Sequence, residues 1–227
     1  MKTGRLFIVA TPIGNPRDIT MRAVDVLGEV DAIICEERRT GTTILKRIGV
    51  LPKEIILLNE HNETAQVTEI ITRLCKGQDL ALISDCGTPV FSDPGHMLIN
   101  QVAQATIPVI PIPGVSSLSA ALSILDFKLE KFIYAGFLSR DAQVRRTELQ
   151  KLRGMRLPVI LMDTPYRLAI LLEDVERIFG KEHRATLACD LTLPAESIYR
   201  DHIGAIRRMI GQRKAEFILI LHGKSSI

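Results

Sequence analysis

Short apolar runs separated by polar loops recur along the first half of the chain. Five of these runs are four to six residues long and bounded by turn residues or charges, at 5–10, 32–35, 55–58, 80–83 and 108–112. Such runs are typical of buried strands. Between them, apolar residues return every three or four positions, as at Val67, Ile70 and Leu74. Strands that alternate with amphipathic helices predict an α/β fold with a mostly parallel sheet, covered on both faces and connected by right-handed crossovers.

The loops that follow these strands are expected to lie together. In an open parallel sheet they emerge at one edge, where such folds bind ligands. The loop after residues 80–83 is longer and denser in glycine and proline than a connection needs, which favours a binding site over an ordinary connection that caps a helix. We therefore expect one crevice, lined by residues 13–14, 36–39, 61–63, 85–91 and 114–117.

The pattern changes in the second half of the chain. Strands are predicted at 132–136, 157–162, 185–189 and 216–222, and helices at 143–153, 168–179 and 203–211. Residues 190–196 are predicted to form a loop. We interpret the second half as a separate α/β domain, with domains at 1–114 and 115–227 and a hinge near residues 112–118.

Composition narrows the class of protein. The chain has 227 residues, 46% of them hydrophobic, which is enough for a substantial core. No apolar run approaches the ~20 residues of a membrane span, and the amino terminus lacks a signal-peptide layout, so we expect a cytoplasmic protein. The four cysteines are scattered, which favours reduced side chains and no metal site. The net charge of +3 is compatible with a nucleic-acid partner, but 3 Tyr, 7 Phe and no Trp argue against an aromatic platform for single-stranded bases.

The usual motifs for nucleotide binding and hydrolysis are absent from the sequence. There is no GxGxxG, no GxxxxGK[ST] and no GxSxG. His61 is isolated, and Ser116 and Ser117 stand at a predicted helix start, where capping is their commoner role. What remains is a crevice of main chain, small hydroxyls and a few carboxylates. It suits a neutral-to-cationic small molecule; S-adenosylmethionine fits this description, but these properties alone do not select it.

Several loop motifs are similar to those of one known family. They are Thr-Pro-Ile-Gly-Asn-Pro-Arg-Asp-Ile-Thr at 11–20, Ser-Asp-Cys-Gly-Thr-Pro at 84–89 with Asp-Pro-Gly at 93–95, and Pro-Gly-Val-Ser-Ser at 113–117. Looser counterparts occur at 36–39, 59–63, 134–138, 166–167 and 190–192. In this order they resemble the tetrapyrrole methylase superfamily, and within it the branch that methylates ribosomal RNA.

The resemblance implies two α/β domains of the tetrapyrrole methylase type, the first with a mostly parallel five-stranded sheet and the second with a mixed sheet. It also implies a homodimer that binds S-adenosylmethionine in a cleft between the domains, with no metal. By position, the family's cofactor contacts fall on Ile13, Gly87, Thr88, Pro89, Phe91, Ser116, Ser117, Met162 and Leu191.

The activity that this resemblance implies is 2′-O-methylation of a cytidine in 16S ribosomal RNA, with the small subunit or its RNA as partner. The enzyme then has to align the ribose hydroxyl and remove its proton. The candidate catalytic residues are Glu37, Arg39 and Asp85, with Glu36 as a further candidate base. Arg38 or Arg39 is a candidate for binding a backbone phosphate. A purely structural ion pair between Glu37 and Arg39 is the competing interpretation.

Arg145, Arg146, Lys151 and Arg153 make the helix at 143–153 basic. A solvated face is the default interpretation of such a helix, and an RNA-docking surface is the sharper hypothesis.

The chain departs from the ribosomal branch mainly in its second half. It has Tyr166 where that branch has histidine, and Cys-Asp-Leu-Thr-Leu at 189–193 where the branch has Arg-Glu-Leu-Thr-Lys. Two alternatives therefore stay open: a methyltransferase of a tetrapyrrole-like or other small molecule, and a non-catalytic S-adenosylmethionine-binding homologue. The loops at 12–15 and 87–89 lack the GxGPGD and GGDP of the tetrapyrrole enzymes, which ranks the first alternative lower.

Overall fold

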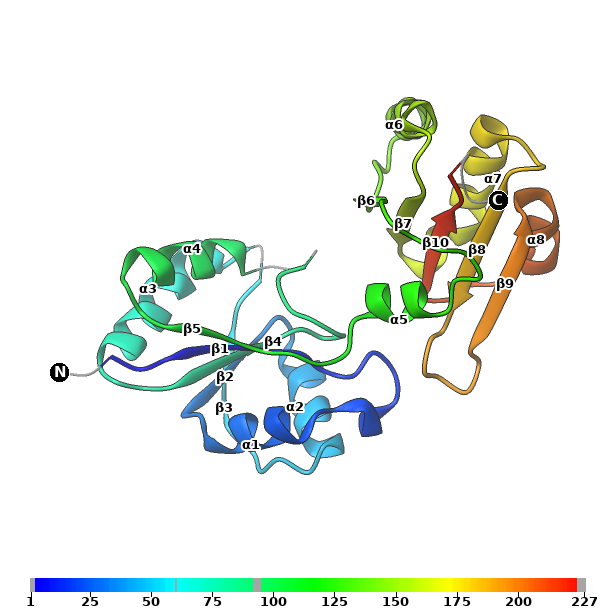
Figure 1. The fold of residues 1–227 in the computed structure, drawn as a ribbon. Coiled ribbons are helices and arrows are strands. Elements are labelled where there is room, and N and C mark those ends of the chain that lie inside the picture. The colour runs from blue at the N-terminus through cyan, green and yellow to red at the C-terminus, as the bar shows by residue number, and fades with distance from the viewer. Residues whose placement is uncertain (1–2, 60, 92–94, 224–227) are drawn as a thin grey trace. The chain divides into compact units, whose positions relative to one another are not determined.

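The computed structural model describes residues 3–59, 61–91 and 95–223. The chain divides into two compact units, Met1–Ser116 and Ser117–Ile227, each built of helices and one sheet (Figure 1). The prediction of an α/β protein with one parallel and one mixed sheet is confirmed. The boundary predicted at residue 114 lies close to this division and stays a prediction.

The first unit contains a five-stranded sheet in the order β3-β2-β4-β1-β5, in which every pair of neighbours is parallel. Each predicted strand of this half is present. The elements are β1 (Leu6–Val9), η1 (Pro16–Asp18), α1 (Met21–Glu29), β2 (Ala32–Cys35), α2 (Arg38–Arg47), β3 (Glu54–Leu57), α3 (Glu63–Cys75), β4 (Leu80–Ile83), α4 (His96–Gln104) and β5 (Val109–Ile112).

Helices cover both faces of this sheet (Figure 1). Leu27 of α1 and Leu45 of α2 pack against one face, and Ile70 of α3 and Leu98 of α4 pack against the other. The chain therefore continues from the neighbouring strands β1 and β4 to helices on opposite faces of the sheet. A parallel sheet opens a crevice where adjacent strands diverge in this way. The topology thus predicts that a ligand crevice opens at the carboxyl ends of β1 and β4, where the two loops singled out by the sequence begin.

The first turns of two helices involve polar residues of the loops before them. Thr20 caps α1 and accepts a hydrogen bond from the Ala23 N–H at 3.2 Å, whereas Asp18 lies in η1. Helix α2 begins at Arg38, so the charged segment at 36–39 is partly helical.

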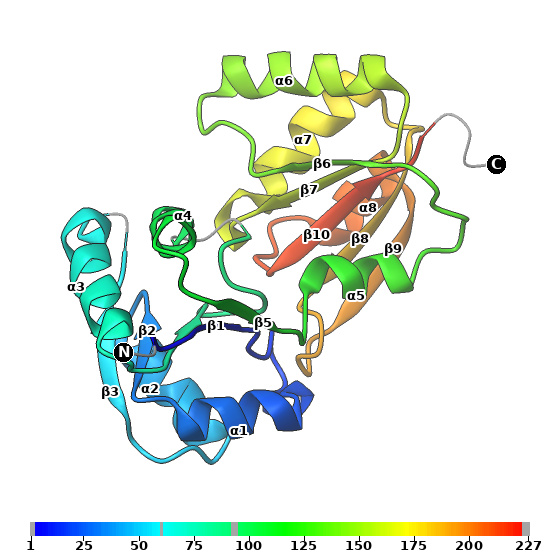
Figure 2. The ribbon, with the colours of Figure 1, turned by 60° about the vertical axis from the view of Figure 1, so that its left-hand side comes forward.

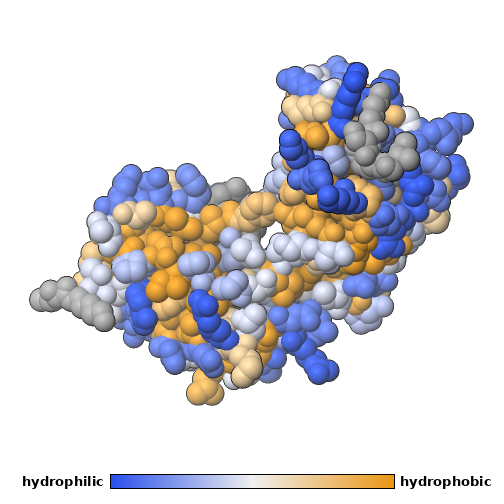
Figure 3. Space-filling view, viewed as in Figure 1, coloured by the Kyte–Doolittle hydropathy of each residue, from blue (hydrophilic) through white to orange (hydrophobic). Residues whose placement is uncertain are grey.

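Strand β5 forms an edge of the first sheet and carries Pro111, which lacks an N–H group and suits an edge position. Apolar side chains gather on the face of the first unit where β5 runs (Figure 3). In that strand Val109 and Ile110 are half-buried and Pro111 is exposed. This is an apolar edge of the kind that proteins commonly cover or blunt.

The second unit holds a five-stranded sheet in the order β6-β7-β10-β8-β9. Only β6 and β7 pair in parallel, so the sheet is mixed. Its elements are α5 (Ser117–Ser123), β6 (Ile133–Gly136), α6 (Ala142–Met155), β7 (Val159–Asp163), η2 (Pro165–Arg167), α7 (Leu168–Phe179), β8 (Arg184–Cys189), β9 (Ser197–His202), α8 (Ile203–Ile210) and β10 (Phe217–Leu221).

Side chains of this sheet alternate between two cores. Leu161 and Leu219 face α6, α7 and α8, whereas Ile160 and Ile218 face α5, which Figure 2 shows on the opposite side of the sheet. Strand β9 was missed by the sequence prediction. Its apolar residues do not alternate, and its place is set by pairing along its whole length with β8.

The basic helix is α6, and the structure uses its arginines internally. Arg145 is 3% exposed, and its Nε and Nη2 donate to Oδ2 of the buried Asp174 in α7 at 2.8 and 2.6 Å. Arg146 donates to the other oxygen of Asp174, at 2.6 Å. Arg153 donates to the carbonyl of Ile178. The hypothesis of an RNA-docking surface is wrong for Arg145, because its guanidinium is enclosed between α6 and α7.

Candidate functional site

The loops after β1 and β4 are tied together through Thr11, which is fully buried. Its N–H donates to the Gly87 carbonyl at 2.8 Å, and its hydroxyl donates to the Ser84 carbonyl at 3.1 Å. The Cys86 thiol contacts the Ile13 carbonyl at 3.6 Å. Because the N–H and the hydroxyl of this buried residue are both hydrogen-bonded, Thr11 fixes the two loops against each other where β1 and β4 end. Sequence analysis did not single out Thr11, although a hydroxyl directly after a buried strand was the available signal.

The loop after β5 joins this pair. The Thr88 hydroxyl donates to the Val115 carbonyl at 3.1 Å, next in sequence to Ser116. Of the candidate cofactor residues, Ile13, Gly87, Thr88 and Ser116 therefore lie on loops that are in direct contact. Pro89 is buried beside them, whereas Phe91 is 49% exposed.

Gly87 is needed at the centre of this junction. Its φ is +81°, and a Cβ there would lie 3.2 Å from Cγ2 of Ile13. Both features exclude a larger residue without movement of the neighbouring loop. The main chain of 84–88 is thereby held against the loop of Ile13. Asp85 and Thr88 of this segment are exposed, so a fixed loop with accessible residues is available to a ligand.

Asp85 and Glu37 both act on one buried thiol at the end of β2. The pKa of Cys35 is raised to about 11, mainly by burial, with smaller upward contributions from the negative charges of Asp85 and Glu37 that the positive charge of Arg38 opposes. The thiol also contacts the Glu37 carbonyl at 3.4 Å. These two candidate bases thus flank the same strand end and are exposed there.

Glu37 does not pair with Arg39. Its Oε2 accepts a hydrogen bond from the Thr40 hydroxyl at 2.9 Å, and within the described part of the chain no ion pair joins it to Arg39. Arg39 is exposed in the first turn of α2. Arg38 donates to the Ile55 carbonyl at 3.1 Å, which leaves Arg39 as the better placed of the two for a phosphate.

The loop after β3 reaches the loop after β4 as well. Oε1 of Glu63 accepts a hydrogen bond from the Gly95 N–H at 3.2 Å. The segment at 92–94, part of the resemblance to the family, lies outside the described residues. Loops after β1, β3, β4 and β5 are thus connected by direct hydrogen bonds, as the common-edge prediction requires.

Two of the three candidate cofactor residues of the second unit share one cluster. Met162 and Leu191 pack against the α5 side of the sheet, together with Tyr134. The Tyr134 hydroxyl donates to Sδ of Met162 at 3.4 Å. Ser117, the remaining candidate, is the first residue of α5. Met162 is only half-buried, so the residue is part of a surface as well as of a core.

Unusual backbone angles mark both candidate loops. Val90 has φ +70°, which is rare for a β-branched residue, and it lies between Pro89 and Phe91. In the second unit, Asp190 and Thr192 have φ +51° and +66° on either side of Leu191. Strained residues of this kind concentrate at binding loops. Sequence analysis missed these positions, since nothing in the residue types predicts a positive φ there.

Asp190 is held in place by a network that sequence analysis also missed. Its Oδ2 accepts from Arg213 at 2.6 Å, and its Oδ1 accepts from the Glu216 N–H at 3.1 Å. Arg213 also donates to the hydroxyls of Ser197 and Tyr199. Ordering this turn fixes the position of Leu191. No group of His, Cys, Asp and Glu side chains suited to a metal occurs among the described residues.

The overall architecture matches solved structures of one class of enzyme. A cobalt precorrin-4 methyltransferase superposes with a TM-score of 0.70 at 16% identity, covering 96% of this chain and 94% of that one. A uroporphyrin-III-C-methyltransferase from Thermus thermophilus superposes with a TM-score of 0.66 at 18% identity, with the same coverage. At these identities the likeness establishes the fold, which is that of methyltransferases with two α/β units.

Sequence comparisons identify the family. The model of the Tetrapyrrole (Corrin/Porphyrin) Methylases matches residues 5–207. A "Ribosomal RNA small subunit methyltransferase I" of Pasteurella multocida is 37% identical over 226 residues, which is 98% of this chain and 80% of the relative. Its namesake in Pseudomonas aeruginosa is also 37% identical, over 227 residues with the same coverage. The chain belongs to the tetrapyrrole methylase family and is an S-adenosylmethionine-dependent methyltransferase.

Proposed function

We propose that this protein methylates the ribose 2′-hydroxyl of a cytidine in 16S ribosomal RNA. The relatives named for the small ribosomal subunit support this acceptor, since they are similar along nearly the whole chain. The structural observation that supports methyl transfer is the set of hydrogen bonds by which Thr11 and Thr88 join the loops after β1, β4 and β5, with Gly87 between them.

The residues of that junction suit the cofactor. The loop is fixed by its hydrogen bonds to Thr11 and by the close approach of Gly87 to Ile13, with Asp85 and Thr88 exposed, so it is preorganised to hold a polar ligand. We assign cofactor contact there to Ile13, Gly87, Thr88, Pro89, Phe91 and Ser116, and in the second unit to Ser117, Met162 and Leu191. When bound, S-adenosylmethionine supplies a methyl group on a positively charged sulfur.

The chain's own task is to hold the ribose hydroxyl in line and to take its proton. Glu37 and Asp85 are exposed carboxylates at neighbouring strand ends, β2 and β4, and either is suited to accept that proton. Arg39 holds a backbone phosphate and so orients the ribose. The proton then passes from the carboxylate to solvent, which restores the base.

The test is methyl transfer from labelled S-adenosylmethionine to small ribosomal subunits purified from cells that lack this gene. Glu37→Gln and Asp85→Asn are made in parallel, with Asp25→Asn, an exposed carboxylate of α1, as the matched control. We expect the variant that removes the base to lose roughly 100-fold or more in kcat, with cofactor affinity unchanged. Subunits that stay unlabelled with the wild-type protein would refute the acceptor.

The competing functions predict different results. A small-molecule methyltransferase leaves subunits unlabelled but turns over with its own acceptor, and a non-catalytic homologue binds S-adenosylmethionine without any turnover. We also propose that the protein is a cytoplasmic homodimer, and the apolar edge at β5 is a candidate surface for the contact between copies (Figure 3). Light scattering tests the dimer. None of the helices within the described residues is long and apolar enough to cross a membrane.

A further inference from the structure

A pocket in the second unit contains a buried carboxylate oxygen without a hydrogen-bond donor. The pocket lies where β6 and β7 end, has a volume of about 440 Å³, and is lined by Phe137, Leu138, Ser139, Arg140, Asp163, Thr164 and Arg167. A volume of this size lies within the range of small-ligand sites. The Asp163 side chain is 1% exposed, and its Oδ2 has no partner in the described structure.

The neighbours of Asp163 satisfy only its other oxygen. Oδ1 accepts the Thr164 N–H at 2.8 Å and lies 3.2 Å from Nη1 of Arg167. Arg167 cannot also serve Oδ2 without losing bonds, because it donates to the carbonyls of Leu138 and Ser139. A buried acceptor left in this state costs free energy, so it calls for a donor supplied from outside the chain.

The other residues that line the pocket indicate the chemistry of that ligand. Phe137 is 49% exposed, so one ring of the lining is accessible for stacking. Arg140 is exposed and adds a positive charge to the lining. Burial raises the pKa of Asp163, and the charge of Arg140 is among those that oppose this rise. A planar group that stacks on one ring, donates one hydrogen bond and carries a nearby negative charge matches a nucleotide. The exposed Phe137 and Arg140 are the side chains that can shift to admit it.

This pocket contains none of the residues assigned to the cofactor. Met162 and Asp163 are consecutive in β7 and point to opposite faces of the sheet. Met162 faces the α5 side, with Leu191. Asp163 therefore lies on the opposite face of β7 from the proposed cofactor residue Met162, and its pocket is a separate site of the second unit.

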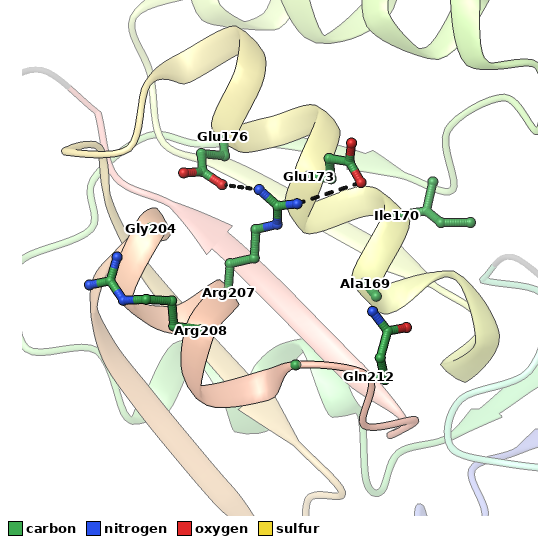
Figure 4. Close-up of a pocket in the computed structure, with 9 residues that line it drawn as sticks. Ala169, Ile170, Glu173, Glu176, Gly204, Arg207, Arg208 and Gln212 are labelled. Carbon is green, nitrogen blue, oxygen red and sulfur yellow. Dashed lines mark hydrogen bonds and ion pairs between the residues drawn. The ribbon is translucent and has the colours of Figure 1, made fainter.

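A second hollow, between α7 and α8, lacks such a feature. Arg207 there donates to Glu176 at 2.6 Å and lies 3.6 Å from Glu173 (Figure 4). Arg207 and Glu173 are exposed there, and Arg207 is satisfied by the two glutamates. An exposed arrangement of this kind is an ordinary surface ion pair.

We propose that the pocket at Asp163 binds an unpaired nucleobase of the RNA substrate, stacked on Phe137 with an exocyclic amino group donating to Oδ2 of Asp163. This rests on the proposed function and adds to it a base-specific subsite. Cytosine has the required amino group, whereas uracil presents an oxygen at the same position and would be repelled by the carboxylate. The subsite therefore selects cytosine over uracil.

Base preference is the first test. Binding of fluorescent oligocytidine and oligouridine of equal length is measured by anisotropy with the full-length protein. A hydrogen bond to a charged group corresponds to about 10- to 100-fold in affinity, so the wild type should prefer oligocytidine by about tenfold or more. Asp163→Asn should abolish this preference. Equal binding of the two oligonucleotides by the wild type would overturn the proposal.

Stacking is tested on the surface, where folding is not at risk. Phe137→Ala should weaken both oligonucleotides by about fivefold or more, whereas Phe132→Ala, at another exposed phenylalanine, should change neither. If Asp163→Asn does not fold, the two phenylalanine variants and the base preference of the wild type still test the proposal. Phe137→Ala with wild-type affinity would contradict the proposal.

Methylation kinetics separate the subsite from the proposed function. With small subunits as acceptor, Asp163→Asn and Phe137→Ala should raise KM for the subunit about tenfold and leave the affinity for S-adenosylmethionine unchanged. Labelled subunits with unchanged KM in both variants would refute the subsite and leave the function standing. Unlabelled subunits, together with a cytosine preference that depends on Asp163, would refute the function and retain the subsite.

Discussion

Gly87 offers a sharp test of the cofactor site, because two other glycines of the first unit serve as controls. Gly28 lies in α1, where a Cβ would meet nothing within 4 Å, and Gly49 has φ +77° with equally open space. Gly87 combines φ +81° with a Cβ position 3.2 Å from Cγ2 of Ile13. The three alanine variants separate helix propensity, backbone conformation and contact with the loop of Ile13.

The expected stabilities follow from these environments. Gly28→Ala should raise the free energy of unfolding by roughly 0.5–1 kcal/mol, since alanine is the better helix former. Gly49→Ala should lower it by about 1–2 kcal/mol, the cost of a left-handed conformation. Gly87→Ala should lower it by at least as much, because Ile13 has to move as well. Urea denaturation followed by circular dichroism measures all three.

Only Gly87→Ala should change cofactor binding. Displacing Ile13 removes contact equivalent to one or two methylene groups, at about 0.8 kcal/mol each, so affinity for S-adenosylmethionine should fall about 4- to 15-fold. Calorimetric titration measures this loss, and Gly28→Ala and Gly49→Ala should bind as the wild type does. If Gly87→Ala loses the same stability as Gly49→Ala and keeps its affinity, the junction at Ile13 is not the cofactor site.

Three further predictions concern stability. Asp174→Asn should lower the free energy of unfolding by about 3 kcal/mol or more, because it leaves two arginines without their buried counter-charge. Glu173→Gln, on the same helix but exposed, should lower it by less than about 1 kcal/mol. Urea denaturation of the two variants measures the difference. Burial lowers the pKa of His222 to about 4, so the unfolded state binds the proton first as pH falls from about 6.5 to 4. Stability should therefore decrease across that range, by up to about 3 kcal/mol, and His222→Gln should flatten the pH profile of Tm. Thr11→Val should cost about 1–3 kcal/mol because the Ser84 carbonyl loses its buried donor, and a Tm unchanged from the wild type would contradict this.

Strands and layers could be predicted from the sequence wherever burial alone determines them. The runs at 32–35 and 80–83 became strands with every residue buried, and the helical spacing of Val67, Ile70 and Leu74 placed α3 on its face of the sheet. A strand at the edge of a sheet could not be predicted in this way. Strand β9 owes its conformation to pairing with β8, and no local pattern announces it.

Charged residues were the hardest to interpret from the sequence, because their roles depend on distant partners. Arg145 and Asp174 are 29 positions apart, yet they form a buried pair once α6 and α7 pack together. A run of basic residues alone cannot distinguish that pair from a solvated surface or an RNA-binding face. Glu37 and Arg39 show the reverse: their closeness in sequence favours an ion pair, but Thr40 takes the carboxylate instead.

Some features of the candidate site could likewise be predicted from the sequence, and others depend on distant partners. The loops at Ile13, Thr88 and Ser116 could be predicted to meet, because a parallel sheet brings the ends of its strands to one edge whatever the side chains are. Asp163 could not be recognised in this way. Its unsatisfied oxygen results from Arg167 bonding to two carbonyls of the loop at 138–139, which depends on how η2 meets the loop after β6. Topology thus determines where a site can form, and individual hydrogen bonds determine what it selects. A base-specific step at Asp163 therefore has to be tested by substitution, even in a family whose fold is certain.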